Sequence, residues 1–496
     1  MKILLRVLQY LQPYRLMVVG TFAFAGLTTG FELIPAWLIK VLIDEVIQAN
    51  RTELLVWVFG GLVGAYLLRN ICSSMRIRLN NSLEQQVVHD LHVQVFSALQ
   101  RLSISFFENR PTGEIMSRVL NDTEHMQRIF VDGLEQTITA SLTLVGIMTV
   151  LFWLNWKLAL LALLPIPLLI FGASGFTKRV HGHYQAIRKG AAELNALLQD
   201  ALAGIRETMG FNRQAYEQER FERKSDLCRQ DTLKAMYLWS FYSPGMTLIG
   251  SLGGVLVLWY GTAEVLQQHL SVGELVMFVS YLALFYVPIN QIHSVNHMLQ
   301  HALAASERVF DILDIVPDVY DRPGLAVPPN RLKGEVSFHH VKFQYRSDVP
   351  ILTDICIAVQ AGERIALVGP SGAGKSTTLK LIPRFYDVTE GSVTIDGYDL
   401  RELPLDFLRS QIGLVQQEPF LFNGTVRENI LYGNLAAGQK AVEAAAKAAR
   451  AHEFITALPE GYDTWIGERG VKLSVGQRQR VSIARVLLKD PPIVLF

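Results

Sequence analysis

Eight consecutive residues late in the chain have the composition of a phosphate-binding loop. They run Gly369, Pro370, Ser371, Gly372, Ala373, Gly374, Lys375 and Ser376. The apolar segment 364–368 before them predicts a short strand, and residues 377–382 predict a helix. The glycines allow backbone N–H groups to face a polyphosphate, while Lys375 can reach the terminal phosphates and Ser376 can ligate Mg²⁺. The loop predicts a nucleotide site, but alone it does not separate a kinase, a GTPase or a transporter motor.

The elements that must position this loop follow a long apolar region. Half of the 496 residues are hydrophobic and only 18% are charged, which disfavours a wholly soluble enzyme. Six apolar runs have the roughly 20 residues that a membrane-spanning helix requires. They cover residues 16–39, 54–75, 134–154, 158–177, 241–263 and 272–292. Six buried helices of a soluble protein would each have to be apolar on every face, so membrane spans are expected.

The basic residues between these runs indicate the orientation of the chain. Lys and Arg accumulate in 76–128 and 178–234, whereas 155–157 and 264–271 are nearly free of them. Because basic loops stay on the cytoplasmic side, we expect a multi-pass protein of the cell membrane whose N-terminus and post-span region are cytoplasmic.

The net charge and the cysteine spacing exclude two classes of function. With 46 Lys+Arg and 45 Asp+Glu, the net charge is +1, so no basic field favours nucleic acid. Cys72, Cys228 and Cys356 lie far apart and form no Cys-x-x-Cys pair. We expect all three to be small buried hydrophobic side chains.

The two basic segments have helical patterns that continue the membrane spans. One set of apolar residues recurs every four positions and predicts a single helix face: Leu79, Leu83, Val87, Leu91, Val95 and Leu99. Residues 109–114 and 209–212 contain the Pro, Gly and Asn typical of turns, and so predict a bend in each segment. The opening residues 1–15 have an amphipathic pattern that fits a helix in the membrane interface.

Further motifs narrow the nucleotide site. Residues 473–477 read Leu-Ser-Val-Gly-Gln and run into an apolar helix, with Ser474 as a favoured helix cap. Residues 465–470 read Trp-Ile-Gly-Glu-Arg-Gly, and Gln417 lies between Val415 and Pro419. Together with the phosphate loop and the six preceding spans, these motifs resemble the ATP-binding cassette family, specifically exporters with one cassette per chain. The resemblance covers nearly the whole chain, and Val475 departs from the glycine common in the family's signature sequence.

This resemblance implies the fold class and the domain order. An all-α polytopic membrane domain of six transmembrane helices with long cytoplasmic helical extensions would be followed by an α/β P-loop ATPase domain. The expected boundaries are 1–313 for the membrane domain, 314–333 for the linker and 334–496 for the cassette. The segment 465–470 would contact the membrane domain.

The resemblance also implies ATP and Mg²⁺ as cofactors. Tyr345 would pack on adenine, Ser376 and Gln417 would lie at the Mg²⁺, and Ser474 and Gly476 would meet the γ-phosphate bound on a partner cassette. The complete set of implied nucleotide-binding residues is Tyr345, Gly369, Pro370, Ser371, Gly372, Ala373, Gly374, Lys375, Ser376, Thr377, Gln417, Ser474, Gly476 and Gln477.

The implied function is ATP-driven export of a small hydrophobic or amphipathic molecule, a drug or a lipid, by a homodimer or heterodimer of half-transporters. In the family, an Mg²⁺-binding aspartate and a water-polarising glutamate end the strand that begins near Ile493. These catalytic carboxylates are expected beyond Phe496, so this chain supplies none of them and ATP hydrolysis depends on their presence. A nucleotide-binding but non-hydrolytic membrane subunit, or a truncated inactive fragment, is the alternative. Glu32 in the first span fits either cation selection or an ion pair with another helix.

Overall fold

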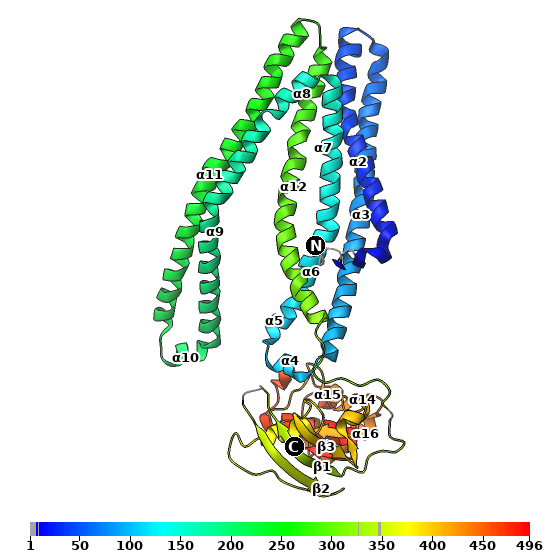
Figure 1. The fold of residues 1–496 in the computed structure, drawn as a ribbon, viewed down its shortest axis with the longest axis vertical. Coiled ribbons are helices and arrows are strands. Elements are labelled where there is room, and N and C mark those ends of the chain that lie inside the picture. The colour runs from blue at the N-terminus through cyan, green and yellow to red at the C-terminus, as the bar shows by residue number, and fades with distance from the viewer. Residues whose placement is uncertain (1–5, 8, 326, 346–348) are drawn as a thin grey trace. The chain divides into compact units, whose positions relative to one another are not determined.

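The computed structural model describes residues 6–7, 9–325, 327–345 and 349–496 (Figure 1). The chain forms two compact units, which are described separately. The first unit comprises Met1–His92 and Leu120–Val309, and the second comprises Val93–Val119 and Phe310–Phe496. The amphipathic pattern of residues 1–15 falls partly outside the described residues, because these begin only at 6 and omit 8.

The first unit is helical throughout. Its helices are α2 (Arg15–Val41), α3 (Leu55–Arg101, which continues into the second unit), α6 (Thr123–Arg128), α7 (Leu134–Leu154), α8 (Trp156–Leu163), α9 (Pro165–Ala203), α10 (Ile205–Gly210), α11 (Gln214–Leu266) and α12 (Val272–Leu313). Shorter 3-10 or π turns precede or link them at Gln9–Tyr14, Leu42–Gln48, Thr52–Leu54, Arg118–Asp122 and Ile129–Gly133.

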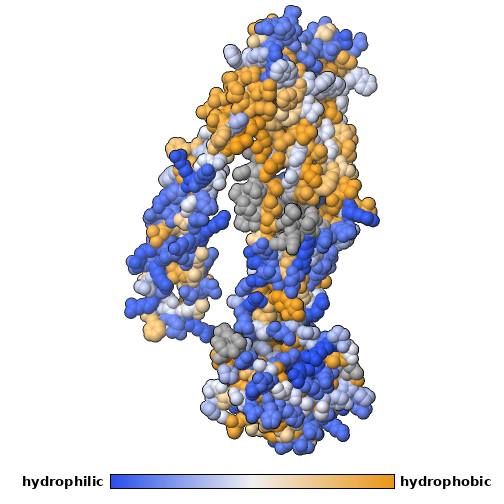
Figure 2. Space-filling model, viewed as in Figure 1, coloured by the Kyte–Doolittle hydropathy of each residue, from blue (hydrophilic) through white to orange (hydrophobic). Residues whose placement is uncertain are grey.

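Six helical segments among the described residues are long and apolar enough to cross a membrane, as the sequence predicts. Several are far longer than a crossing needs: Gln214–Leu266 has 53 residues and Trp156–Ala203 has 48. Figure 2 shows hydrophobic side chains over the upper part of the first unit, near α8, and hydrophilic ones over the lower part of the α9–α11 pair. The predicted extension of the spans beyond the apolar zone is confirmed.

The four-residue apolar repeat of α3 lies on one buried helix face, as predicted, except that its first member, Leu79, is half-buried. Leu83, Val87, Leu91, Val95 and Leu99 are all buried, while Val93 and Phe96 between them are exposed. A helix with one buried apolar face packs against other elements on that side and presents its opposite face outward.

The upper part of the first unit has its own hydrophobic core. α7, α8, α11 and α12 contribute Ile147, Leu158, Val257 and Phe278, all fully buried. Tyr281 of α12 donates a hydrogen bond to the Leu33 carbonyl oxygen at 2.7 Å, which ties α12 to α2. Below this core, α9 and α11 run together and diverge from α12 (Figure 1).

Glu32 has an ion-pair partner. Arg69 Nη2 of α3 lies 3.0 Å from Glu32 Oε1 of α2. Because an unpaired charge in the membrane is unfavourable, this pairing accounts for both side chains. Of the two interpretations of Glu32, the ion pair with another helix is the one observed.

The second unit contains two sheets. β1 (Val336–Phe343), β2 (Leu352–Val359), β3 (Glu390–Ile395) and β4 (Tyr398–Asp399) form an antiparallel sheet in the order β2-β1-β3-β4. β5 (Ile412–Leu414) pairs in parallel with β6 (Ile493–Leu495). The helices are α4 (Ile104–Glu108), α5 (Thr112–Ser117), α13 (Lys375–Leu381), α14 (Leu405–Ser410), α15 (Val426–Leu431), α16 (Gln439–Ala448), α17 (His452–Thr456) and α18 (Val475–Lys489), with 3-10 turns at Leu400–Glu402, Gly461–Asp463 and Glu468–Gly470.

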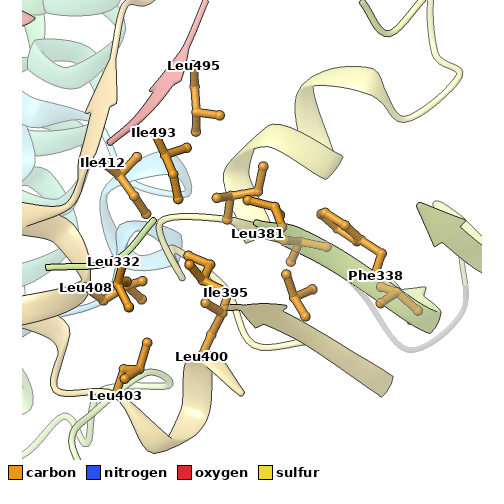
Figure 3. Close-up of a cluster of buried hydrophobic side chains, with 14 of the residues drawn as sticks. Leu332, Phe338, Leu381, Ile395, Leu400, Leu403, Leu408, Ile412, Ile493 and Leu495 are labelled. Atoms are coloured by element: carbon orange, nitrogen blue, oxygen red, sulfur yellow. The ribbon is translucent and has the colours of Figure 1, made fainter. Parts of the chain in front are cut away.

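Two hydrophobic clusters divide this unit. The strand cluster joins the sheets to α13 and α14 through residues such as Phe338, Leu381 and Ile412 (Figure 3). The helical cluster joins α15, α16 and α18 through Ile430, Val442 and Val481. The phosphate loop adjoins the first cluster and the Leu473–Gln477 motif the second.

The predicted strand at 364–368 is not observed. No ladder hydrogen bonds join this segment to another strand among the described residues, and Val368 is 88% exposed. A strand is defined by hydrogen bonds to a neighbouring strand, and in the part of the chain that the structure describes no strand pairs with this segment. The helix predicted after the loop is confirmed as α13.

Candidate nucleotide site

The phosphate loop has a backbone that only glycine readily adopts at two positions. Gly372 and Gly374 have φ of 86° and 84°, in the left-handed region. A Cβ at Gly374 would lie 2.5 Å from Leu352 Cδ2, so a side chain there would also clash with β2. α13 begins directly after this glycine.

The lysine of the loop lies against the loop itself. Lys375 Nζ donates to the carbonyl oxygens of Gly369 at 2.9 Å and Pro370 at 2.7 Å. Ser376 is exposed, whereas the neighbouring Thr377 is buried. These residues fit a Mg²⁺–polyphosphate: Gly372 and Gly374 leave the backbone open to a ligand, the Lys375 ammonium lies at the loop, and the Ser376 hydroxyl is a hard oxygen ligand.

The structure brings Tyr345 to the phosphate loop. Its hydroxyl lies 3.3 Å from Thr377 Oγ1. Its ring packs edge-on against Phe343 and Tyr386, with centroids 4.9 Å and 5.1 Å away, and stays 44% exposed. The residue therefore presents an aromatic surface beside the phosphate site, which suits an adenine ring.

The signature residues form the predicted helix cap. Ser474 Oγ accepts a hydrogen bond from the Gln477 amide at 3.3 Å, and Gln477 Oε1 accepts one from the Ser474 amide at 2.8 Å. This reciprocal capping box fixes the start of α18. Ser474, Val475 and Gly476 are exposed.

The chain does not bring the signature to its own phosphate loop. Leu473 and Val481 anchor the signature in the helical cluster, whereas Leu381 anchors the loop helix in the strand cluster. No hydrogen bond of the described residues joins the two motifs, and both expose residues to solvent, among them Gly372, Ser376 and Ser474.

Gln417 lies in an exposed segment that is tied to α18. Arg485 of α18 donates to Phe420 O at 3.1 Å, to Asn429 O at 2.8 Å and to Asn429 Oδ1 at 2.9 Å. The side chain of Asn429, which is buried, makes two hydrogen bonds with the backbone of Phe422. Its Oδ1 accepts one from the Phe422 amide, and its Nδ2 donates one to the Phe422 carbonyl oxygen. Burial lowers the pKa of Arg485, but its ordinary value is so high that it stays charged. This network positions the Gln417 segment, and sequence patterns do not reveal it.

A second group of residues that the sequence does not predict connects α4 to the strand cluster's edge. Glu108 Oε1 accepts a hydrogen bond from Lys380 Nζ at 2.7 Å, and Glu108 Oε2 accepts one from Tyr386 Oη at 2.6 Å. Lys380 lies on α13, and the Tyr386 ring packs on Tyr345. α4 is therefore linked through two residues to the helix and the aromatic ring of the nucleotide site.

Charge and burial both shift the pKa values of Glu108 and Tyr386. Burial of the Glu108 carboxyl opposes its ionisation, but the hydrogen bonds from Lys380 and Tyr386 and the Lys380 charge outweigh it, so the pKa of Glu108 is lowered. Burial and the hydrogen bond to Glu108 raise the pKa of Tyr386. The contact is thus an ionised carboxylate held by an ammonium and a phenol at neutral pH.

The cysteines only partly follow the prediction. Cys72 is buried and Cys228 is half-buried, but Cys356 is exposed. Cys356 lies on β2, the edge strand of the four-stranded sheet, on the face opposite the core. The prediction was wrong for this residue because side chains alternate between the two faces of a strand.

Comparisons with known proteins cover both parts of the chain. A family model described as the ABC transporter transmembrane region matches residues 18–289, and one described as ABC transporter matches residues 352–496. An ATP-dependent lipid A-core flippase of Syntrophus aciditrophicus is 38% identical over 461 residues, 93% of this chain and 76% of that protein. A putative multidrug export ATP-binding/permease protein of Bacillus subtilis is 34% identical over 503 residues, 100% of this chain and 87% of that protein.

A solved structure shows the same fold. The structure of a bacterial Atm1-family ABC exporter with ATP bound matches with a TM-score of 0.80 and 30% sequence identity, covering 97% of this chain and 85% of that one. The order of helical region and nucleotide site is therefore shared over nearly the whole chain.

Proposed function

Because the chain belongs to the ABC transporter family, with the helical membrane domain and nucleotide-binding domain of an exporter, we propose that it exports a hydrophobic or amphipathic molecule, a lipid or a drug. Similarity to a lipid A-core flippase and to a putative multidrug export protein supports this substrate class. The exposed apolar residues of the spans agree with a surface in contact with lipid.

The observation that carries the proposal is the separation of the two nucleotide motifs. The phosphate loop and Ser474 belong to different clusters and face outward in one chain. A complete site therefore needs two chains, so that Ser474 and Gly476 of one meet the phosphates held by Lys375 of the other. A second copy or a related half-transporter supplies the partner.

Each residue has a defined role in this arrangement. Tyr345 stacks on adenine, backbone N–H groups of residues 369–376 hold the phosphates, and Lys375 exchanges the carbonyls of Gly369 and Pro370 for phosphate oxygens. Ser376 and Gln417 provide oxygen ligands for Mg²⁺. When bound there, Mg²⁺ would supply compensation of the phosphate charge.

Nucleotide binding then has a physical route to the spans. Tyr345 packs on Tyr386, and Tyr386 and Lys380 hold Glu108 in the segment that follows α3. A shift of Tyr345 or α13 on nucleotide binding pulls on Glu108 and hence on α3. We also propose that the cassette at 334–496, the linker at 314–333 and the N-terminus lie on the cytoplasmic side of the cell membrane. The basic segments beside the spans support this orientation.

The test is transport in membrane vesicles with the Lys375→Ala variant. We expect ATP-dependent uptake of a fluorescent lipid or cationic dye to fall to background, with binding of a fluorescent ATP analogue reduced at least tenfold. Lys440→Ala, a change of an exposed lysine on α16, is the matched control and should behave as the unmodified protein. Undiminished transport by Lys375→Ala contradicts the proposal. Nucleotide binding without any transport by the unmodified protein supports the non-hydrolytic alternative instead.

A further inference from the structure

Three metal-ligating side chains meet on the exposed face of β1 and β2. His340 comes from β1, and Asp354 and Cys356 come from β2. His340 Nδ1 lies 2.8 Å from Asp354 Oδ1 and 3.7 Å from Cys356 Sγ. One ligand atom from each residue lies within 4.8 Å of the other two. This cluster is on the far side of the sheet from its buried face, and the nucleotide site does not use it.

Irregularities in both strands create the cluster. Phe338 faces the core, so regular alternation would turn residue 340 inward as well, but His340 is exposed and Val341 is buried instead. The register of β1 and β2 shifts between Phe338 and Val341. Such a bulge inserts one residue and changes which side chains face outward. His340 is the residue that this bulge moves to the exposed face.

β2 contains the matching irregularity. Leu352 is buried, and alternation would turn residue 354 inward, but Asp354 is exposed and the inward positions resume at Ile355. Cys356 is two residues further on and shares the exposed face. Both bulge residues have left-handed backbones, with φ of 48° at His340 and 55° at Asp354, which side chains larger than glycine adopt infrequently.

The arrangement favours ion binding over nucleophilic catalysis. A Cys–His–Asp catalytic relay uses both imidazole nitrogens, one toward the thiol and one toward the carboxylate. Here the thiol and the carboxylate both lie near the same nitrogen, Nδ1, so the three ligand atoms form one compact group. The neighbouring His339 is turned elsewhere, with Nε2 3.3 Å from Thr394 Oγ1.

We propose that His340, Asp354 and Cys356 bind Zn²⁺. Imidazole nitrogen, thiolate sulfur and carboxylate oxygen are the three ligand types of protein zinc sites, whereas Mg²⁺ and Ca²⁺ prefer oxygen alone. Water fills the fourth position, and binding releases the Cys356 thiol proton to solvent. All three side chains are exposed, so the ion enters without any rearrangement of the core. The ion joins the edge strand β2 to β1.

The test uses Co²⁺ as a spectroscopic probe of the full chain in detergent, reduced and without a polyhistidine tag. We expect a thiolate-to-Co²⁺ charge-transfer band in the near ultraviolet and tetrahedral d–d bands in the visible, saturating at one ion per chain and displaced by Zn²⁺. Cys356→Ser should abolish the charge-transfer band, and His340→Ala should weaken binding at least tenfold. Cys72→Ser, Cys228→Ser and His339→Ala are matched controls and should leave the spectrum unchanged.

Binding of a fluorescent ATP analogue shows that each variant is folded, because none of these residues belongs to the nucleotide site. If the unmodified protein gives only the weak octahedral spectrum of free Co²⁺, or if the thiolate band persists in Cys356→Ser, the proposal is wrong.

Discussion

The two turns that interrupt the long helices differ in what their side chains contact. The first turn, residues 102–118, is engaged within its own compact unit: Glu108 is held by Lys380 and Tyr386, and Ser103 donates to Asp318 at 3.0 Å. The second turn, residues 204–213, presents bare apolar side chains, with Met209 62% and Phe211 73% exposed. Both turns end pairs of helices that extend well beyond a membrane crossing.

This difference indicates that the first turn makes its contacts within its own chain, whereas the second turn is available to another molecule. In the first turn, Glu108, Ser103 and Ser105 already have hydrogen-bond partners within the chain, whereas Met209 and Phe211 leave an apolar surface exposed at the second turn. Aromatic side chains are enriched among the residues that anchor interfaces. Around Phe211, a shallow pocket lined by Thr208, Arg213 and Tyr216 adds polar groups at the edge of this apolar tip. We therefore expect the second turn to be a docking surface for the second chain of the proposed dimer.

The largest effect is expected from placing a charge at the second turn. In Phe211→Asp, a carboxylate replaces the aromatic anchor, and loss of such an anchor costs roughly 2 kcal/mol or more of interface energy. ATP-dependent transport in vesicles should fall more than tenfold, while binding of a fluorescent ATP analogue stays unchanged. Phe211→Leu keeps an apolar group and should retain most transport. Normal transport by Phe211→Asp would show that the second turn does not need an apolar contact with another chain.

Reversing the charge at the first turn should have a smaller effect. In Glu108→Lys, two ammonium groups face each other, but Glu108 and Lys380 are 44% and 36% exposed, so water screens them. Transport should fall by roughly threefold to fivefold, as expected for the loss of a partly exposed ion pair worth about 1 kcal/mol.

The exchanged pair supplies the control for that experiment. Glu108→Lys combined with Lys380→Glu restores opposite charges and should recover at least half of the lost transport. If the double variant transports less than either single variant, the ion pair does not carry the coupling.

A weaker effect is expected at Asp318, which accepts hydrogen bonds from both Ser103 and Ser105. Asp318→Ala removes the acceptor from an exposed contact, where water can replace it, so transport should change by about twofold or less. A tenfold loss measured in the same vesicles would show that the serines, and not Glu108, fix the first turn.

The smallest effect is expected from pH. Because the pKa of Glu108 is lowered, its contact is complete above the ordinary carboxyl pKa near 4.3 and is lost only as the pH falls through the lowered value. The ratio of transport by the unmodified protein to that by Glu108→Gln should therefore stay constant between about pH 6 and 8. A ratio that changes severalfold in this interval would mean that another titrating group controls the first turn.

Much of the fold follows from local sequence patterns. The six spans, the α3 repeat and the helix breaks within 109–114 and 209–212 were predicted correctly, because hydropathy, helical periodicity and turn composition are properties of neighbouring residues. The cap formed by Ser474 and Gln477 was predictable for the same reason, since a capping box spans only four residues. The positive φ angles in the phosphate loop were also predictable, because Gly372 and Gly374 are residues that adopt them readily.

What the sequence does not predict depends on distant residues. Glu108 and Lys380 lie far apart in the chain, as do Arg485 and Asn429, and nothing in their neighbourhoods marks them as partners. The segment 364–368 has an apolar composition but lacks a paired neighbour, so composition alone misled. His340 lies outward only because a bulge interrupts alternation, which no periodic pattern encodes.

The length of the α9–α11 pair makes it a mechanical lever. Pro244 lies inside α11 and lacks the N–H of a regular helical turn, so the helix lacks one backbone hydrogen bond here, and this is the position at which we expect it to bend. From Gln214 to Pro244, the helix extends about 45 Å, so a tilt of about 5° at the pivot displaces the tip by roughly 4 Å. A motion smaller than one helical turn at Phe211 is thereby converted into a slight rotation among the spans. For a given force on the tip, the turning moment at Pro244 increases with the length of the arm. A long arm held at its tip can therefore rotate tightly packed helices that a shorter arm could not.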